Sequence, residues 1–145
     1  MNYQTEPITM WFDRRLVLRK SPIQGIGTFA TQDIHTGEML IMVTGGIVVT
    51  LEERQSGNLQ LEGSMYNGEA LADDLFIVTP KMFHYYINHS CDSNAIDLSR
   101  SANSTQYVAS RLIRANEEIT ADYYDKTTLE ACACNSPLCR WKNPA

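Results

Sequence analysis

Four cysteines are the side chains of this sequence with the clearest capacity for chemistry. Cys132, Cys134 and Cys139 form a C-x-C-x4-C cluster, and Cys91 lies far upstream in the chain. Tetrahedral zinc sites take four such thiolates, so the cluster alone is one ligand short. If Cys91 supplies the fourth thiolate, the metal ties the C-terminal tail to an internal loop. Two disulfides in a secreted chain are the alternative, but the short C-x-C spacing favours a metal.

Three further patterns could bind or orient a ligand. The glycines of Gly25-Ile26-Gly27 allow the backbone to approach a ligand closely. Asn88-His89-Ser90 offers donors and acceptors for a polar ligand directly before Cys91. Tyr123 stands near the end of a predicted strand, and the partner of a buried tyrosine hydroxyl can be a reacting group. Taken singly, these patterns also fit a plain turn, a capped loop and a core side chain.

The bulk properties limit the class of protein. The chain has 145 residues, 43% of them hydrophobic, which suits one domain with one core. The net charge of −5 argues against direct nucleic-acid binding and is compatible with a basic protein or peptide partner. No stretch approaches the ~20 apolar residues of a membrane span, and no signal peptide is visible. We therefore expect a cytoplasmic or nuclear protein with reduced thiols that binds no membrane. The oligomeric state cannot be predicted.

Short apolar runs between turn residues predict a β-rich chain. Gly45 and Gly46 are expected to break one apolar run into two strands. The expected strands are residues 16–20, 27–30, 39–43, 47–50, 75–78, 105–112 and 118–124.

Helix signals are few. Thr50 and Glu53 form a capping box, which predicts a helical turn at residues 51–54. Pro80 favours a short helix at residues 81–86. Residues 56–74 are expected to form a loop with a short strand near Tyr66.

In their order along the chain, the motifs resemble those of the SET-domain protein lysine methyltransferases. The resemblance extends from about residue 16 to residue 141, and the terminal cysteine cluster is similar to the family's post-SET zinc cluster. In that cluster the fourth ligand is the cysteine of an N-H-S-C motif, here Cys91. The other matching segments are Ser21–Ala30 (an opening G-x-G strand pair), Ile34–Leu40 (I-x-x-G-E), Tyr86–Asn94 ([FY]-I-N-H-S-C-x-P-N) and Glu117–Tyr123 (E-E-L-T-x-D-Y).

The resemblance implies a fold and a division of the chain. The fold would be mainly β (β-rich α+β), a SET fold of several small sheets with a C-terminal pseudoknot and a post-SET zinc tail. The pseudoknot would bring Asn88 and His89 beside Tyr123. Residues 1–15 would form an N-terminal segment, residues 16–126 the SET domain and residues 127–145 the zinc-binding tail.

The resemblance also implies the site and its reaction. Methyl groups would pass from S-adenosylmethionine to the ε-amine of a lysine in a basic protein segment, such as a histone tail. Tyr123 would be the catalytic residue, and the cofactor would be held by Ile26, Gly27, Tyr86, Asn88, His89 and Trp141. The substrate-lysine pocket would include Ala121, Asp97 and Tyr123, and structural zinc would be held by Cys91, Cys132, Cys134 and Cys139. Trp141 could equally be a hydrophobic plug of the tail.

Three positions depart from the family's pattern around the lysine pocket. Val43 stands where a tyrosine is common, unless another tyrosine such as Tyr66 supplies that hydroxyl. Ala121 and Asp97 stand where an aromatic residue often limits the number of methyl groups. A second reading follows: a zinc-stabilised binding module on a SET scaffold with weak or no catalysis.

Overall fold

The computed structural model describes residues 4–55, 66–99, 104–123 and 131–142. About half of the described residues are in strands and few are in helices, as predicted for a mainly β fold. None of the helices in these ranges is long and apolar enough to cross a membrane. The strands are β1 (Gln4–Phe12), β2 (Leu16–Lys20), β3 (Ile26–Ala30), β4 (Met39–Thr50), β5 (Tyr66–Ala72), β6 (Leu75–Pro80), β7 (Asn88–His89), β8 (Ala95–Asp97), β9 (Ser104–Ala109) and β10 (Glu118–Ala121); α1 (Leu51–Gln55) and the 3-10 helix η1 (Phe83–Tyr86) are the helices.

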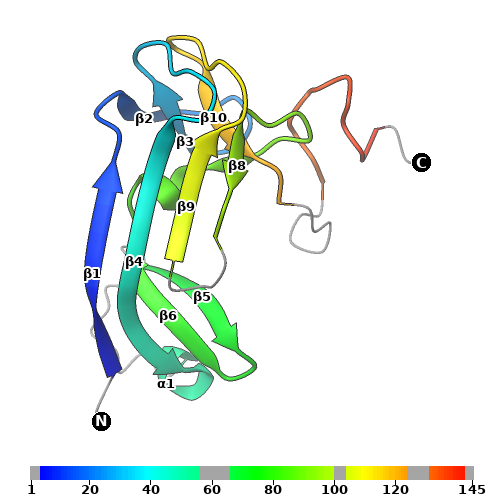
Figure 1. Cartoon of the computed structure of the whole chain (residues 1–145). Coiled ribbons are helices and arrows are strands. Elements are labelled where there is room, and N and C mark those ends of the chain that lie inside the picture. Colours follow the sequence, from blue (N-terminus) through cyan, green and yellow to red (C-terminus); the bar gives the residue numbers. More distant parts are fainter. Residues whose placement is uncertain (1–3, 56–65, 100–103, 124–130, 143–145) are drawn as a thin grey trace.

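Several small sheets were expected, but the strands join into one continuous, strongly curved sheet (Figure 1). Its order is β2-β3-β10-β8-β9-β4-β6-β5, with β1 added to β4 and β7 added to β10. Strand β4 pairs with β9 through its first half and with β6 through its second half. It therefore joins the β5–β6 hairpin at one end of the molecule to the strands that surround β10 at the other.

Strand β4 corrects the expectation of a break at Gly45 and Gly46, because it runs through both residues without interruption. The two glycines have φ values of 81° and 146°, in the region that favours glycine. A Cβ atom on Gly46 would lie 2.6 Å from the side chain of Ile77 on β6. The glycines thus let β4 bend and pack closely against its neighbour.

Several other element boundaries differ from the sequence prediction. The helix expected at residues 81–86 is a single 3-10 turn at Phe83–Tyr86, and Pro80 ends strand β6 rather than opening a helix. Strand β9 ends at Ala109 and β10 at Ala121, so both are shorter than predicted. Strand β5 is longer than the short strand expected near Tyr66, and strands β1, β7 and β8 were not predicted.

The predicted capping box is confirmed. The backbone N–H of Thr50 donates to Glu53 Oε2 over 2.8 Å, and the N–H of Glu53 donates to Thr50 Oγ1 over 3.1 Å. This reciprocal pair begins helix α1 directly after strand β4.

The core is built mainly from small and branched apolar side chains. Its fully buried members include Leu40, Ile41, Ile113 and Ile119. Three alanines, Ala95, Ala109 and Ala121, lie in the same cluster. Because Ala95 and Ala121 face each other on adjacent strands, β8 and β10 pack with little side-chain bulk between them.

Strand β10 lies beside the segment that carries Asn88 and His89. It pairs in parallel with β7, where Thr120 is opposite Asn88 and Ala121 is opposite His89. This is the neighbourhood expected from the pseudoknot. The tail from residue 131 onward then extends beyond this end of the sheet (Figure 1).

Candidate functional site

Tyr123 follows strand β10 and is held by two hydrogen bonds to the segment around β7. Its hydroxyl donates to the carbonyl oxygen of Ile87 over 2.5 Å, and its backbone N–H donates to His89 Nδ1 over 3.1 Å. Burial of the hydroxyl end raises the pKa of Tyr123, and the negative charge of Glu118 and the nearby Tyr85 add to the rise. The hydroxyl therefore stays protonated and is fixed in direction, while 40% of the residue remains exposed.

Asn88 connects strand β7 to the glycine turn before β3. Its side-chain Nδ2 donates to the carbonyl oxygens of Gln24 and Ile26, at 3.1 and 3.4 Å, and to Glu118 Oε1 at 2.8 Å. Gly27 lies directly behind this contact, because a Cβ atom there would lie 2.1 Å from Glu118 Oε1. The absent side chain of Gly27 is therefore what lets the carboxylate reach Asn88.

His89 is buried and connects Tyr123 to the first cysteine. Because Nδ1 accepts the N–H of Tyr123, the neutral ring carries its proton on Nε2, which lies 3.3 Å from Cys91 Sγ. Burial lowers the pKa of His89, although the nearby Asp122 partly opposes that effect. The ring thus stays neutral and donates toward the sulfur.

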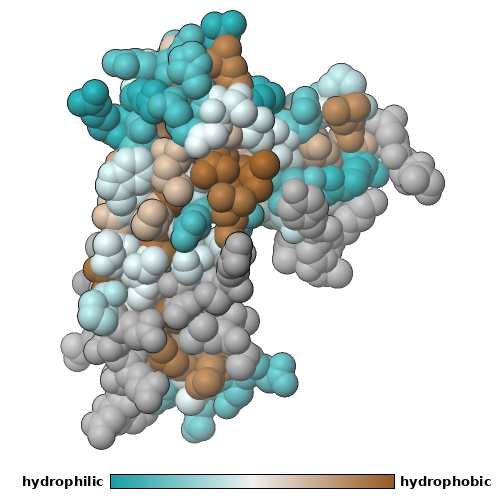
Figure 2. Space-filling view, viewed as in Figure 1, coloured by the Kyte–Doolittle hydropathy of each residue, from teal (hydrophilic) through white to brown (hydrophobic). Residues whose placement is uncertain are grey.

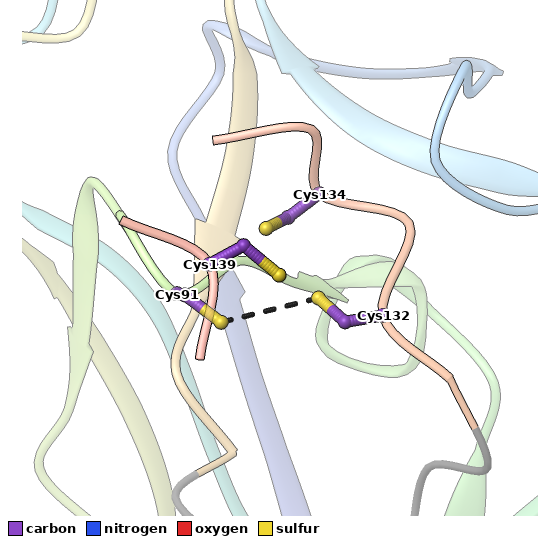
Figure 3. Close-up of side chains that lie close together, drawn as sticks. All are labelled: Cys91, Cys132, Cys134 and Cys139. Atoms are coloured by element: carbon purple, nitrogen blue, oxygen red, sulfur yellow. Dashed lines mark hydrogen bonds between the residues drawn. The ribbon is translucent and has the colours of Figure 1, made fainter. Parts of the chain in front are cut away.

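The four cysteines converge on one point, with their sulfur atoms directed toward one another (Figure 3). All four Sγ atoms lie within 4.8 Å of one another, and Cys91 Sγ is 3.9 Å from Cys132 Sγ. Zinc–sulfur bonds of ~2.3 Å in a tetrahedron give sulfur–sulfur distances of ~3.8 Å. The arrangement fits one tetrahedral metal ion.

The thiols of this group differ in acidity. Burial opposes ionisation of Cys134, but hydrogen bonds from the backbone of Cys91 and Ser136 outweigh it and lower the pKa of this thiol to about 6. The same burial raises the pKa of Cys132 to about 12. The backbone around the cluster is thus arranged to stabilise at least one thiolate, the form that binds zinc.

An ion pair holds the tail independently of the cysteines. Arg140 donates from Nη1 and Nη2 to the two carboxylate oxygens of Asp122, at 2.6 and 2.7 Å. The backbone N–H of Arg140 also points at Cys91 Sγ, at 3.4 Å. Trp141 follows with its ring edge toward His89, at 5.5 Å between centroids. The last described turn of the tail is thereby packed against the residues next to Tyr123.

A cleft opens where these parts meet. Its walls come from the turn before β3, from the segment around β7 and from the beginning of the described tail. The residues that line it are Ile23, Gln24, Asn88, His89, Tyr123, Ala131, Cys132 and Ala133.

Among the predicted cofactor residues, Asn88 and His89 line this cleft together with Tyr123. Gly27 is buried behind Asn88, whereas Ile26 is 47% exposed at the rim of the turn. Tyr86 packs edge-on against Tyr85 in η1. Trp141 lies on the His89 side, where it closes the tail against the protein body.

The residues predicted for the lysine pocket are spread more widely. Ala121 is buried in the core beside Ala95, two residues before Tyr123. Asp97 is exposed at the end of β8, where its carboxylate accepts the backbone N–H of Ser99. Val43 is buried in the same core cluster as Ala121. The side chain of Tyr66, proposed as a substitute for a tyrosine at Val43, lies outside the described part.

Sequence reasoning assigned no role to several residues that shape the site. Glu118 and Arg140 each bond to predicted site residues or to their neighbours, and Asn94 fixes strand β10 with its side chain. Each belongs to a motif noted in the sequence or follows it directly. Their contacts span 18 to 30 residues of chain, so spacing alone gave no signal for them.

Comparison with known proteins is consistent with this geometry. A sequence model of the family described as "SET domain" matches residues 25–124. The chain is 32% identical over 145 residues to the histone H3-lysine(4) N-trimethyltransferase ATX1 of Arabidopsis thaliana, an alignment that covers 89% of this chain and 13% of that protein.

Two further relatives carry similar names. The histone-lysine N-methyltransferase trr of Drosophila melanogaster is 30% identical over 142 residues, which covers 87% of this chain and 6% of that protein. The "Histone-lysine N-methyltransferase, H3 lysine-4 specific" of Cryptococcus neoformans var. neoformans is 30% identical over 148 residues, which covers 90% of this chain and 10% of that protein. The chain therefore spans only a small part of each of these relatives.

Proposed function

This chain belongs to the SET domain family, and from that premise we propose that it is a protein lysine methyltransferase that uses S-adenosylmethionine. Its substrate would be a lysine in a basic protein segment, with a histone tail as the first candidate because the relatives' names specify histone lysine. A histone substrate would place the protein in the nucleus. The observation that carries the proposal is Tyr123, whose hydroxyl is fixed by Ile87 beside a cleft lined by Asn88 and His89.

The cleft has the chemistry that this cofactor requires. Gln24 and Asn88 offer polar groups, whereas Tyr123 and the alanines at 131 and 133 give a partly apolar wall. Such a mixture suits a ligand with an amino-acid end and a purine end. S-adenosylmethionine would supply an electrophilic methyl group on a cationic sulfur. Asn88 and His89 would hold the cofactor, and the tail with Trp141 would cover it.

The chain's own residues would deliver a neutral amine to the reaction. A free lysine has a pKa of ~10.4, so its amine must lose a proton before it can attack. Burial of the incoming lysine among apolar side chains would disfavour the ammonium ion through desolvation. Because Tyr123 donates its only hydroxyl proton to Ile87, its oxygen lone pairs are free to accept an N–H of the amine. Catalysis would rest mainly on this orientation.

Strand β8 offers an edge on which an extended substrate could dock. It pairs with β9 along its length, whereas its pairing with β10 is confined to Ala95. Ile96 and Leu98 are 42% and 45% exposed there. Figure 2 shows an apolar area over β8, facing the hollow between the protein body and the tail. A basic segment added as an extra strand at this edge would complement the net charge of −5.

Methyl transfer to histones and basic peptides tests the proposal directly. The wild type should transfer labelled methyl groups from S-adenosylmethionine, and Tyr123→Phe should lower the rate by about 100-fold, because the amine loses its orienting oxygen. Zinc content and cofactor binding should not change in this variant, since the ring stays in place. Equal rates in wild type and Tyr123→Phe would contradict the assignment of Tyr123.

The alternative is a zinc-stabilised binding module with weak or no catalysis. It is favoured by Val43 and Ala121, which give the core near Tyr123 two small or apolar side chains and no hydroxyl. Calorimetry separates the two readings, since a methyltransferase must bind S-adenosylmethionine and a binding module need not. Cofactor binding without turnover on any histone would favour the alternative.

A further inference from the structure

Glu118 is a charged residue held entirely by neutral partners. Its Oε2 accepts the hydroxyl proton of Ser21 over 2.8 Å, and its Oε1 accepts an amide proton of Asn88, also over 2.8 Å. Ser21 is itself buried and accepts the backbone N–H groups of Ile23 and Gln24. These contacts fix the carboxylate in position without neutralising its charge.

No ion pair found among the described residues neutralises Glu118. Every carboxylate that does form an ion pair within the described ranges has an arginine partner. These are Asp13, Asp33, Glu38, Glu117 and Asp122. Glu118 therefore contributes a full negative charge at this end of the sheet.

That charge is directed toward the cleft. Asn88, which bonds to the Glu118 carboxylate, lines the cleft together with Gln24 and Tyr123. The field of Glu118 also reaches the Tyr123 hydroxyl, since it contributes to the raised pKa of that group. Glu118 is half-buried where its carboxylate lies against Gly27, so solvent screens its charge less than it screens a fully exposed carboxylate.

We propose that Glu118 selects the charge state of the bound cofactor, favouring the cationic S-adenosylmethionine over its neutral product S-adenosylhomocysteine. This inference rests on the proposed function. The two ligands differ by a methyl group and by the positive charge on sulfur. A fixed negative charge nearby stabilises only the cation, because Coulomb attraction needs both charges. The same charge would therefore favour replacement of the bound product by a new S-adenosylmethionine after each transfer.

Glu118→Gln isolates the charge, because glutamine keeps the size and one acceptor oxygen for Asn88. Calorimetry should show the Kd for S-adenosylmethionine rising about tenfold, whereas the Kd for S-adenosylhomocysteine changes less than twofold. Sinefungin, which carries an amine in place of the sulfonium, should behave like S-adenosylmethionine. Glu118→Asp keeps the charge and should retain most of the wild-type ratio of the two affinities.

Glu117→Gln is the matched control, because it removes the same charge one residue away, where the carboxylate bonds to Arg111. It should leave the affinity ratio unchanged. Ser21→Lys tests the Glu118 charge in a second way, because an ammonium group beside Glu118 would neutralise the carboxylate without removing it. This variant should lower the ratio as Glu118→Gln does.

The outcomes separate the inference from the proposed function. If Glu118→Gln weakens both ligands equally, Glu118 only shapes the site, and the inference is wrong. An unchanged ratio in Glu118→Gln and in Ser21→Lys would also overturn it. A wild type that binds neither ligand would overturn the proposed function, and the inference with it.

Discussion

Asn94 attaches strand β10 to the loop after β7 through its side chain. Its Oδ1 accepts the backbone N–H of Thr120 over 2.9 Å, and its Nδ2 donates to the carbonyl oxygen of Glu118 over 2.8 Å. The residue is 1% exposed, so water cannot replace these bonds. A single amide thus makes two of the hydrogen bonds that a neighbouring strand would otherwise make to β10.

Asn94→Ala should lower the free energy of unfolding by about 2–4 kcal/mol, because two buried backbone groups lose their partners. Urea unfolding at neutral pH with zinc present measures the change. Ser93→Ala, at the half-buried neighbouring position, should change it by less than about 1 kcal/mol. A loss for Asn94→Ala as small as that of the control would mean that β10 does not depend on this amide.

Gly27 and Glu118 should behave as one unit. Gly27→Ala puts a methyl group 2.1 Å from the present position of Glu118 Oε1, so the carboxylate must move away from Asn88. We expect a loss of cofactor affinity of about tenfold or more, because the Asn88 amide loses its support. Glu118→Ala removes the clashing atoms, and the double variant should therefore be little worse than Glu118→Ala alone. Calorimetry with S-adenosylhomocysteine on the four proteins measures the coupling, and simple additivity would contradict it.

At the scale of elements, helix η1 contains a buried histidine with an incomplete set of partners. His84 Nε2 lies 3.2 Å from Thr79 Oγ1 of β6, and its ring stacks on Phe12 of β1. The other ring nitrogen, Nδ1, is buried without a hydrogen-bond partner in the described part of the chain. Burial lowers the pKa of His84 from 6.5 to about 4. The packing of η1 between β1 and β6 therefore requires a neutral ring.

This histidine should make the fold sensitive to acid. The unfolded chain takes up the His84 proton near pH 6.5 and the folded chain only near pH 4, so protons favour unfolding between those values. The stability is present above pH 6.5 and is lost as the pH falls toward 4. Between pH 7 and pH 5 we expect His84 to account for a loss of about 2 kcal/mol.

Urea unfolding of wild type and His84→Gln at pH 7 and pH 5 measures this contribution, because glutamine cannot titrate. The wild type should lose about 2 kcal/mol more than the variant over this interval. Any release of a bound metal ion by acid would affect both proteins and cancel in the difference. Equal losses in the two proteins would show that His84 is not the acid-sensitive group.

Elements whose cause is local were predictable from the sequence, and those that depend on distant partners were not. Thr50 and Glu53 are three residues apart, and their capping box begins α1 as expected. A break was expected in strand β4 because glycine is a poor strand former. The structure has Gly46 there because a side chain at this position would clash with the neighbouring strand β6. Strand β1 contains too little alternation to be recognised and exists because β4 offers it an edge.

The same distinction holds for the candidate site. The cysteine cluster and the Asn88-His89 segment were recognisable because residue types and their spacing define them. The structure brings both together with Tyr123. The roles of Glu118 and Asn94 were not recognisable, because each depends on where a side chain points once distant segments of the chain lie together.

At the scale of the whole molecule, the tail meets the body through two different kinds of contact. The Arg140–Asp122 ion pair is one, and the Cys91 sulfur in the cysteine cluster is the other. Both end beside His89 and Tyr123, so the position of the tail and the shape of the cleft depend on each other. The ion pair alone contributes little, because the Arg140 side chain is 36% exposed. We therefore expect a bound metal ion to contribute most of the free energy that holds the tail against the body.

Removal of zinc should release the tail and open the cleft without unfolding the sheet. Cys134→Ser leaves three thiolates, and we expect about one equivalent less bound zinc, a lower Tm and at least tenfold weaker binding of S-adenosylhomocysteine. Hydrogen exchange should increase in residues 131–142 and stay unchanged in β4 and β9. Leu138→Ala is the control, because this side chain lies between the ligands but is 65% exposed. A Cys134→Ser protein that keeps its zinc and its affinity would show that the tail closes the cleft without the metal.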